Sequence, residues 1–409
     1  MMQFLNLKKV KRRGISMDNF EYVVPTRLIV GKEKENQVGQ IIKEYGFTNV
    51  LVVYGQKSVK ASGLLDRVIN SLRESEINYV LLGGVEPNPK LSYVIDGVKI
   101  ARENQVELVL AIGGGSVIDA AKSICAGYYY EGNPYDFNDK KVVLKKSLPI
   151  ATILTIAAAG SEMSTSCVIS DASRNQKKGF NSELNRPLFS ILNPELTYTV
   201  NKYQTACGIV DIMMHTLERY FNPSLNIEFA DEIAIGLLKA VKKAGEVVIN
   251  DLTNYEARRS LMLAGAFSHN GLTGIGKNVP MPVHQLEHAL SGYYDFVAHG
   301  AGLAVLFPKW SMLYYKSDVK KFSYFAKEVM GVKEEDECKA AYLGIVAIQS
   351  FFKELGMPAT FKDLGIENPN IDKLLDILFD GREHIESLGR KIDRKEAEKI
   401  YLYCLKEDF

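Results

Sequence analysis

The sequence predicts an N-terminal α/β domain with a parallel, Rossmann-like sheet, followed by an all-α C-terminal domain. Up to about residue 200, short apolar runs alternate regularly with amphipathic segments, which is typical of βαβ units. Beyond that point strand-like runs nearly vanish and long helical patterns replace them. The length of 409 residues also favours two domains over a single core.

The expected strands are rich in Val, Leu and Ile, as in a sheet that is covered on both faces. They span 48–55 (TNVLVVYG), 77–85 (INYVLLGGV), 106–115 (VELVLAIGGG), 148–156 (LPIATILTI) and 189–196 (FSILNPEL). The helices expected between them span 58–75, 91–105 and 116–129, and the long helical patterns that follow include 228–250, 255–272 and 318–330.

Both periodicities are interrupted between Asn193 and Thr205, which marks the domain boundary. We therefore expect a dinucleotide-binding domain over 17–200 and a helical metal-binding domain over 201–409. Residues 1–16 are basic and lack the long apolar region of a signal peptide, so a flexible extension is expected there.

Composition excludes several classes of partner. Charged residues make up 24% of the chain and the net charge is +1, so neither nucleic acid nor an anionic membrane surface is indicated. No apolar run is long enough to span a bilayer. The five cysteines are odd in number and never form a CxxC pair, which fits a reducing cytoplasm better than a disulfide framework.

A glycine-rich turn joins the third expected strand to the next helix, in AIGGGSVIDAAK at 111–122. Glycines let a ligand approach the backbone closely, and the free amides at a helix start favour a phosphate, so a diphosphate is the expected ligand. The spacing is not GxGxxG, however, and a tight turn with close helix packing explains the glycines equally well. Asp119 and Lys122, one turn later, either reach the ligand or cap and solvate the helix.

Two segments offer candidate metal ligands. In DIMMH, Asp211 and His215 are four residues apart and share one helix face, among apolar neighbours that leave little polar surface. A solvent-exposed pair is the alternative. In HQLEHALSGYYDFVAHG, His284 and His288 have the HxxxH spacing of metal ligands, and His299 follows.

These five residues are one more than a closed four-coordinate site would use, so one of them has another role. His269 and His384 lack a partner at such spacing and are interpreted as residues that lie at the surface or behind the ligands. A phosphate cradle in one domain and a mixed Asp/His site in the other together indicate a cleft where a nucleotide meets a metal-activated substrate.

The chain resembles the iron-dependent (group III) alcohol dehydrogenases, within them the butanol dehydrogenase and broad-range aldehyde reductase branch. The resemblance extends over nearly the whole chain from Met17. It rests on PTRLIVGK, VEPNP, GGGSVIDAAK, AAGSEMS, RPLFSILNPELTYT, VDIMMHTLERY, NGLTGIGK and HQLEHALSGYYDFVAHGAGLAV.

The resemblance implies a role for each candidate residue. The family's four metal ligands fall on Asp211, His215, His284 and His299, which leaves His288 beside the nicotinamide and the substrate, where it would relay a proton. The implied cofactor-binding residues are Gly114, Gly115 and Ser116 at the pyrophosphate, with Asn88, Pro89, Asp119, Thr155, Lys177 and Leu196 along the dinucleotide. The stretch TIAAAGSE replaces a threonine-rich segment of many relatives.

The implied reaction is hydride transfer between a nicotinamide and a primary alcohol or aldehyde, in which a divalent metal eases loss of the alcohol proton. The family name favours Fe²⁺, although the ligand types also suit Zn²⁺. Relatives are commonly dimers, so a homodimer is expected, with a small-molecule substrate as its other partner.

Alternatives within the same superfamily are a glycerol dehydrogenase and a lyase like the dehydroquinate synthases. The lyase would need several cations around a phosphorylated, carboxylated sugar. The segment 210–305 is poor in them.

NADP(H) is expected to be favoured over NAD(H). NADH-preferring enzymes place Asp or Glu after an early strand to bind the ribose hydroxyl, and that carboxylate repels a 2′-phosphate. This chain has no acid from Gly55 to Lys60, and Ser58 can donate a hydrogen bond there.

Overall fold

The computed structural model describes residues 19–222, 227–387 and 390–407. The extension expected over residues 1–16 lies outside the described residues. Among the described helices, none is both long and apolar enough to cross a membrane.

The N-terminal part contains a six-stranded parallel sheet in the order β1-β8-β5-β4-β2-β3. Its strands are β1 (Arg27–Val30), β2 (Asn49–Gly55), β3 (Asn78–Val85), β4 (Leu108–Gly113), β5 (Ile150–Leu154) and β8 (Phe189–Leu192). The expected Rossmann-like sheet is therefore confirmed, and the edge strand β1 is added to the strands that the sequence predicted.

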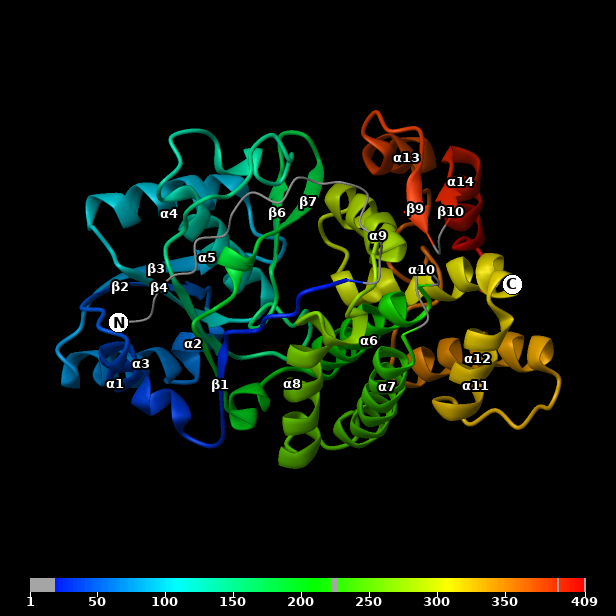
Figure 1. Cartoon of the computed structure of the whole chain (residues 1–409), viewed down its shortest axis with the longest axis horizontal. Coiled ribbons are helices and arrows are strands. Elements are labelled where there is room, and N and C mark those ends of the chain that lie inside the picture. Colours follow the sequence, from blue (N-terminus) through cyan, green and yellow to red (C-terminus); the bar gives the residue numbers. More distant parts are fainter. Residues whose placement is uncertain (1–18, 223–226, 388–389, 408–409) are drawn as a thin grey trace.

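Helices cover both faces of this sheet, which explains why its strands are apolar without alternation (Figure 1). In β4, Leu108, Leu110 and Ile112 pack towards α1 and α3, whereas Val109 and Ala111 pack towards α4 and α5. The helices are α1 (Val38–Glu44), α2 (Ser58–Ala61), α3 (Leu64–Glu74), α4 (Leu91–Glu103) and α5 (Gly115–Gly127). The helix expected over 58–75 is two helices, because Gly63 adopts a left-handed φ of 68° between them.

An antiparallel hairpin, β6 (Ser166–Asp171) and β7 (Gln176–Asn181), projects from the α/β part. The sequence did not predict it. It lies beside α9 of the helical part (Figure 1).

The C-terminal part is helical, as expected, except for a short hairpin of β9 (Ile385–Ser387) and β10 (Arg390–Ile392). The helices are α6 (Lys202–Tyr220), α7 (Glu228–Val248), α8 (Tyr255–His269), α9 (Pro282–Tyr293), α10 (His299–Tyr314), α11 (Val319–Glu328), α12 (Glu337–Glu354), α13 (Ile371–Phe379) and α14 (Arg394–Tyr403). One apolar core joins them, and α6 is buried along almost its whole length.

Polar contacts join the two parts across the space between them. Lys178 of β7 pairs with Asp380 after α13 at 2.7 Å, and Gln176 donates to the same carboxylate at 2.9 Å. On another segment, Lys90 pairs with Asp295 at 2.7 Å, between α9 and α10. These contacts hold the β6–β7 hairpin and the 88–90 turn against the helical part.

Candidate active site

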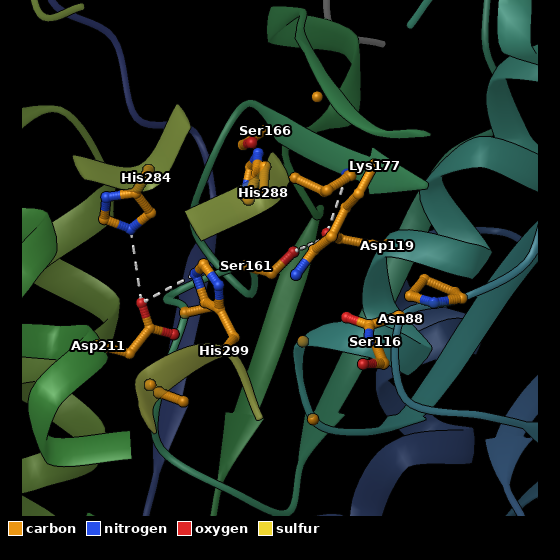
Figure 2. A pocket seen from close by; sticks show the side chains of 18 of the residues that line it. Asn88, Ser116, Asp119, Ser161, Ser166, Lys177, Asp211, His284, His288 and His299 are labelled. Atoms are coloured by element: carbon orange, nitrogen blue, oxygen red, sulfur yellow. Dashed lines mark hydrogen bonds and ion pairs between the residues drawn. The ribbon is translucent and has the colours of Figure 1, made fainter. Parts of the chain in front are cut away.

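A cavity of about 1830 Å³ lies between the two parts, and the cofactor-binding and metal-binding residues expected from the sequence and its resemblance line it. Lys122, the other candidate of the glycine turn, does not line it. On the α/β side these are Gly55, Ser58, Asn88, Pro89, Gly114, Gly115, Ser116, Asp119, Thr155, Lys177 and Leu196. On the helical side they are Asp211, His215, His284, His288 and His299. Figure 2 shows the metal-side residues at one end and Asn88 and Ser116 at the other.

The glycine turn lies at the carboxyl end of β4, where α5 begins at Gly115. No side chain caps this helix start, so its first amides are available to an anion. The close-packing interpretation is also correct in part. A Cβ on Gly114 would collide with Ile156, and one on Gly113 would collide with Val117.

Asp119 and Lys122 do not simply face solvent. The Asp119 carboxylate accepts hydrogen bonds from Ser161 Oγ at 2.6 Å and from the Val168 amide at 2.9 Å. Lys122 is fully buried, and its ammonium donates to the main-chain oxygens of Ser161 and Ser166 at 2.7 and 2.8 Å. Burial lowers the pKa of Lys122, an effect that the charge on Asp119 opposes. Both residues fix the 161–168 segment, which forms a wall of the cavity.

Asp211, His284 and His299 converge on one point from three helices. Nε2 of His284 and Nε2 of His299 each lie 3.7 Å from Oδ1 of Asp211 (Figure 2). Their candidate ligand atoms lie within 4.8 Å of one another. Asp211 Oδ1 and His284 Nε2 are buried and have no hydrogen-bond partner among the described residues. Such unsatisfied atoms are costly unless a ligand pairs with them, so the group fits a metal ion.

His215 lies beside this group but not within it. Its Nδ1 is 3.1 Å from Oδ1 of Asp211 and 3.0 Å from the main-chain oxygen of Asp211. Its ring centroid is 4.4 Å from that of His284. Burial lowers the pKa of His215 to about 3, so its imidazole is neutral, which is the form that binds metal.

Two glutamates hold the candidate ligand rings, and neither was assigned a role from the sequence. The Glu218 carboxylate contacts Nδ1 of His284, and the Glu287 carboxylate contacts Nδ1 of His299. In both rings this leaves Nε2 directed at Asp211. Carboxylates on the far nitrogen of a ligand histidine fix its tautomer and orientation. The signal in the sequence was HxxE, which occurs at 215–218 and again at 284–287.

The negative charge of Glu287 faces two basic groups, His299 on α10 and Lys177 on β7. Burial would raise the pKa of Glu287, but the charges of His299 and Lys177 outweigh it and lower the pKa to about 2. Lys177 of β7 lies 3.6 Å from Glu287 Oε2 and donates to Ser291 Oγ at 3.0 Å. The lysine expected at the cofactor thus also reaches the helix that carries His284.

His288 and His269 take different places. The His288 ring lies 5.5 Å from that of His299, and its candidate ligand atoms group with those of Glu287 and His299 and not with Asp211. His269 was interpreted from the sequence as a residue at the surface or behind the ligands. It lines the cavity, with its ring 4.0 Å from that of His215. His384 also lines the cavity.

Asn88 has a left-handed φ of 52° and donates through its side chain to Asp295 Oδ1 at 3.1 Å. This expected cofactor residue therefore contacts the helical part directly. Gly55 ends β2, and Ser58 begins α2 beyond it, at the rim of the sheet.

Comparisons with known proteins follow the same division of the chain. Residues 25–194 match the family described as "Iron-containing alcohol dehydrogenase", and residues 205–403 match "Fe-containing alcohol dehydrogenase family, C-terminal".

Two curated relatives and one solved structure illustrate the similarity. The chain is 44% identical to NADH-dependent butanol dehydrogenase B of Clostridium acetobutylicum over 87% of this chain and 92% of the relative. It is 32% identical to the NADPH-dependent aldehyde reductase YqhD of Escherichia coli over 88% and 92%. The crystal structure of NADH-dependent butanol dehydrogenase A from Thermotoga maritima superimposes with a TM-score of 0.92 at 36% identity, covering 95% of this chain and 99% of that one.

Proposed function

This chain belongs to the iron-containing alcohol dehydrogenase family, and from that membership we propose how its own residues serve the reaction. The protein is an oxidoreductase that interconverts alcohols and aldehydes with a nicotinamide cofactor and iron. The butanol dehydrogenases and the aldehyde reductase among its relatives support short primary alcohols and the corresponding aldehydes as its substrates.

In this proposal Asp211, His215, His284 and His299 are the metal ligands. The observation that carries it is the buried Oδ1 of Asp211, which accepts no hydrogen bond among the described residues and faces Nε2 of His284 and of His299 at 3.7 Å. His215 completes the set from the turn of α6 that follows Asp211. A bound divalent ion would supply positive charge next to the substrate oxygen.

His288 is proposed to be the catalytic residue that handles the proton. It follows His284 by one helical turn and lies beside His299, so one of its ring nitrogens can exchange the proton of the substrate hydroxyl. Its candidate ligand atoms lie near those of His299 and of Glu287, which pairs with Lys177 at 3.6 Å, and this position supports the role.

The dinucleotide is proposed to lie along the α/β wall of the cavity. Gly114, Gly115 and Ser116 bind the pyrophosphate at the start of α5, and Gly55 and Ser58 border the adenosine ribose. The remaining proposed cofactor-binding residues are Asn88, Pro89, Asp119, Thr155, Lys177 and Leu196. Asp119 serves the cofactor indirectly, by positioning Ser161 and Val168, because both of these donate hydrogen bonds to its carboxylate.

A preference for NADP(H) is proposed on the residues that follow β2, where no acid occurs from Gly55 to Lys60. Lys57 and Ser58 line the cavity there. Some relatives are named for NADH and others for NADPH, so the proposed preference rests on these residues and not on the relatives.

We further propose a homodimer in the cytoplasm, which light scattering and cell fractionation would test. All five cysteines are unpaired, as a reducing compartment requires.

One experiment tests the assignment as a whole. The metal-free protein is loaded with Fe²⁺ or Zn²⁺ and assayed with butanal and with either reduced cofactor. We expect aldehyde reduction only after loading, with one metal bound per chain by elemental analysis. Turnover by a protein freed of metal would contradict the proposed ligand set.

A further inference from the structure

Arg219 is a buried positive charge on the helical side of the cavity. It lies in α6, is 8% exposed and lines the same cavity as the proposed ligands. Its Nη1 donates to the main-chain oxygen of His215. In the described part of the chain, no carboxylate lies within ion-pair distance of its guanidinium.

The acids nearest to Arg219 are engaged elsewhere. Glu218 accepts hydrogen bonds from the amide of Val283 and from Nδ1 of His284. Asp231 pairs with two lysines, Lys277 and Lys321. Lys277 also donates to the main-chain oxygen of Arg219, at 3.2 Å. Cations therefore outnumber available carboxylates here, and a buried charge without a partner is unfavourable.

A second polar group faces this region without a partner. Nδ1 of His269, at the end of α8, is buried and has no hydrogen bond among the described residues. The His269 ring lies 4.0 Å from that of His215, whose main-chain oxygen accepts the hydrogen bond from Arg219. Arg219 and His269 thus line the same cavity from two different helices.

Arg219 lies on the same helix as two of the proposed metal ligands, and its side chain is held in place by packing. It follows His215 by four residues and Asp211 by eight, which corresponds to about 6 and about 12 Å along the helix axis. Gly274 packs against its stem, since a Cβ there would lie 3.0 Å from Arg219 Cδ. Together with the hydrogen bond to the main-chain oxygen of His215, this contact holds the guanidinium beside a proposed ligand.

We propose that Arg219 and Nδ1 of His269 form an anion subsite, which binds a carboxylate at the far end of a short aldehyde or alcohol substrate. A guanidinium matches the two oxygens of a carboxylate, and a single cation balances its single charge. The inference rests on the proposed function, because that function places the reacting carbonyl at the other end of the substrate.

The test compares unbranched aldehydes of four, five and six carbons with aldehydes of the same lengths that end in a carboxylate. The kcat/KM ratio of carboxylated to plain aldehyde is measured for the wild type, Arg219→Gln and Arg219→Lys. Arg258→Gln is the matched control, since Arg258 is 4% exposed, lies in the same part of the protein and does not line the cavity. Calorimetry measures binding of the four-carbon hydroxy acid to the metal-loaded protein without cofactor.

We expect the ratio in the wild type to exceed that in Arg219→Gln by about tenfold or more, with Arg219→Lys in between and Arg258→Gln unchanged. The hydroxy acid should bind at least about tenfold more weakly to Arg219→Gln than to the wild type.

Equal binding by the wild type and Arg219→Gln would overturn the subsite, even if plain aldehydes were reduced well. Selective binding without turnover of any aldehyde would support the subsite and contradict the proposed function instead.

Discussion

Glu218 accepts a hydrogen bond from Nδ1 of His284, although the two residues are 66 positions apart and lie on different helices. The contact directs the other nitrogen of the ring towards Asp211. Glu287 does the same for His299, from one helix to the next. The shape of the proposed metal site therefore depends on two buried carboxylates as well as on the ligands.

Replacing Glu218 with Gln should lower metal affinity about 10- to 100-fold. The amide has one acceptor oxygen for the two donors, Val283 N and His284 Nδ1, and carries no charge that would raise the basicity of the ring. Affinity is measured by competition with a chelator. Glu162→Gln is the control, since Glu162 is also buried but, among the described residues, makes no hydrogen bond or ion pair with a proposed ligand. An unchanged affinity in Glu218→Gln would show that the contact is structural only.

The two histidines of the HxxxH pair should respond differently to replacement. His284→Ala should lose both bound metal and turnover, because it removes a proposed ligand. His288→Ala should keep the metal and lose mainly rate, because it removes the proposed proton carrier. Elemental analysis beside kcat distinguishes them, and equal metal loss in both variants would show that the ligand set is assigned wrongly.

Gly55→Asp should abolish the proposed preference for NADPH. A Cβ at this position would have ordinary contacts, 3.8 Å from Val117 and 3.9 Å from the main-chain oxygen of Val85, so the carboxylate can be accommodated. Its repulsion of a 2′-phosphate should cost on the order of 1–3 kcal/mol.

Gly55→Asn, of similar size but uncharged, is the control for this substitution. The ratio of kcat/KM for the two cofactors is the measurement. A wild-type enzyme that favours NADH would refute the proposed preference and leave the family assignment intact.

The ionised carboxylate of Asp139 should stabilise the fold at neutral pH but not in strong acid, where it is protonated. Burial would raise its pKa, but Lys178, Lys141 and Arg174 donate to it at 3.0 to 3.1 Å and lower the pKa from 3.8 to about 2. The carboxylate therefore contributes on the order of 2 kcal/mol above pH 4, and this is lost as pH falls through about 2.

Asp139→Asn should consequently lower Tm by several degrees at pH 7, and the difference from wild type should shrink towards pH 3. Asp372→Asn, at a side chain that is 91% exposed, should leave Tm unchanged at both pH values. A difference in Tm for Asp139→Asn that does not depend on pH would rule out the ion pairs as its cause.

Much of the fold could be predicted because its signals are local. The buried strand over Leu108–Gly113 and the glycine turn after it are contiguous in the sequence, and the structure places them as predicted. The β6–β7 hairpin could not be predicted in this way. Its second strand, QKKGFN, has neither apolar alternation nor β-branched residues, and its lysines are accounted for by partners on distant segments.

In the candidate site too, features that are local in the sequence could be predicted, whereas contacts between distant segments could not. Asp211 with His215, and His284 with His288, could be proposed as candidate ligands because each pair follows a helical repeat. The choice of His299 over His288 as a ligand comes from the resemblance alone. The role of Glu218 could not be predicted, since HxxE would suggest that it serves His215 on its own helix. It contacts His284 instead, through packing that brings α6 and α9 together.

The Lys177 contact with Glu287 and Ser291 limits how freely such enzymes can be recombined. Strand β7 belongs to the half of the chain that carries the glycine turn, yet its lysine reaches the carboxylate that orients His299. A chimera whose first half comes from a relative without a cation at position 177 would leave the buried Glu287 carboxylate without the positive charge of Lys177. The two halves therefore behave as a matched pair, and a recombination point between Asn193 and Thr205 requires position 177 to be exchanged together with 287 and 291.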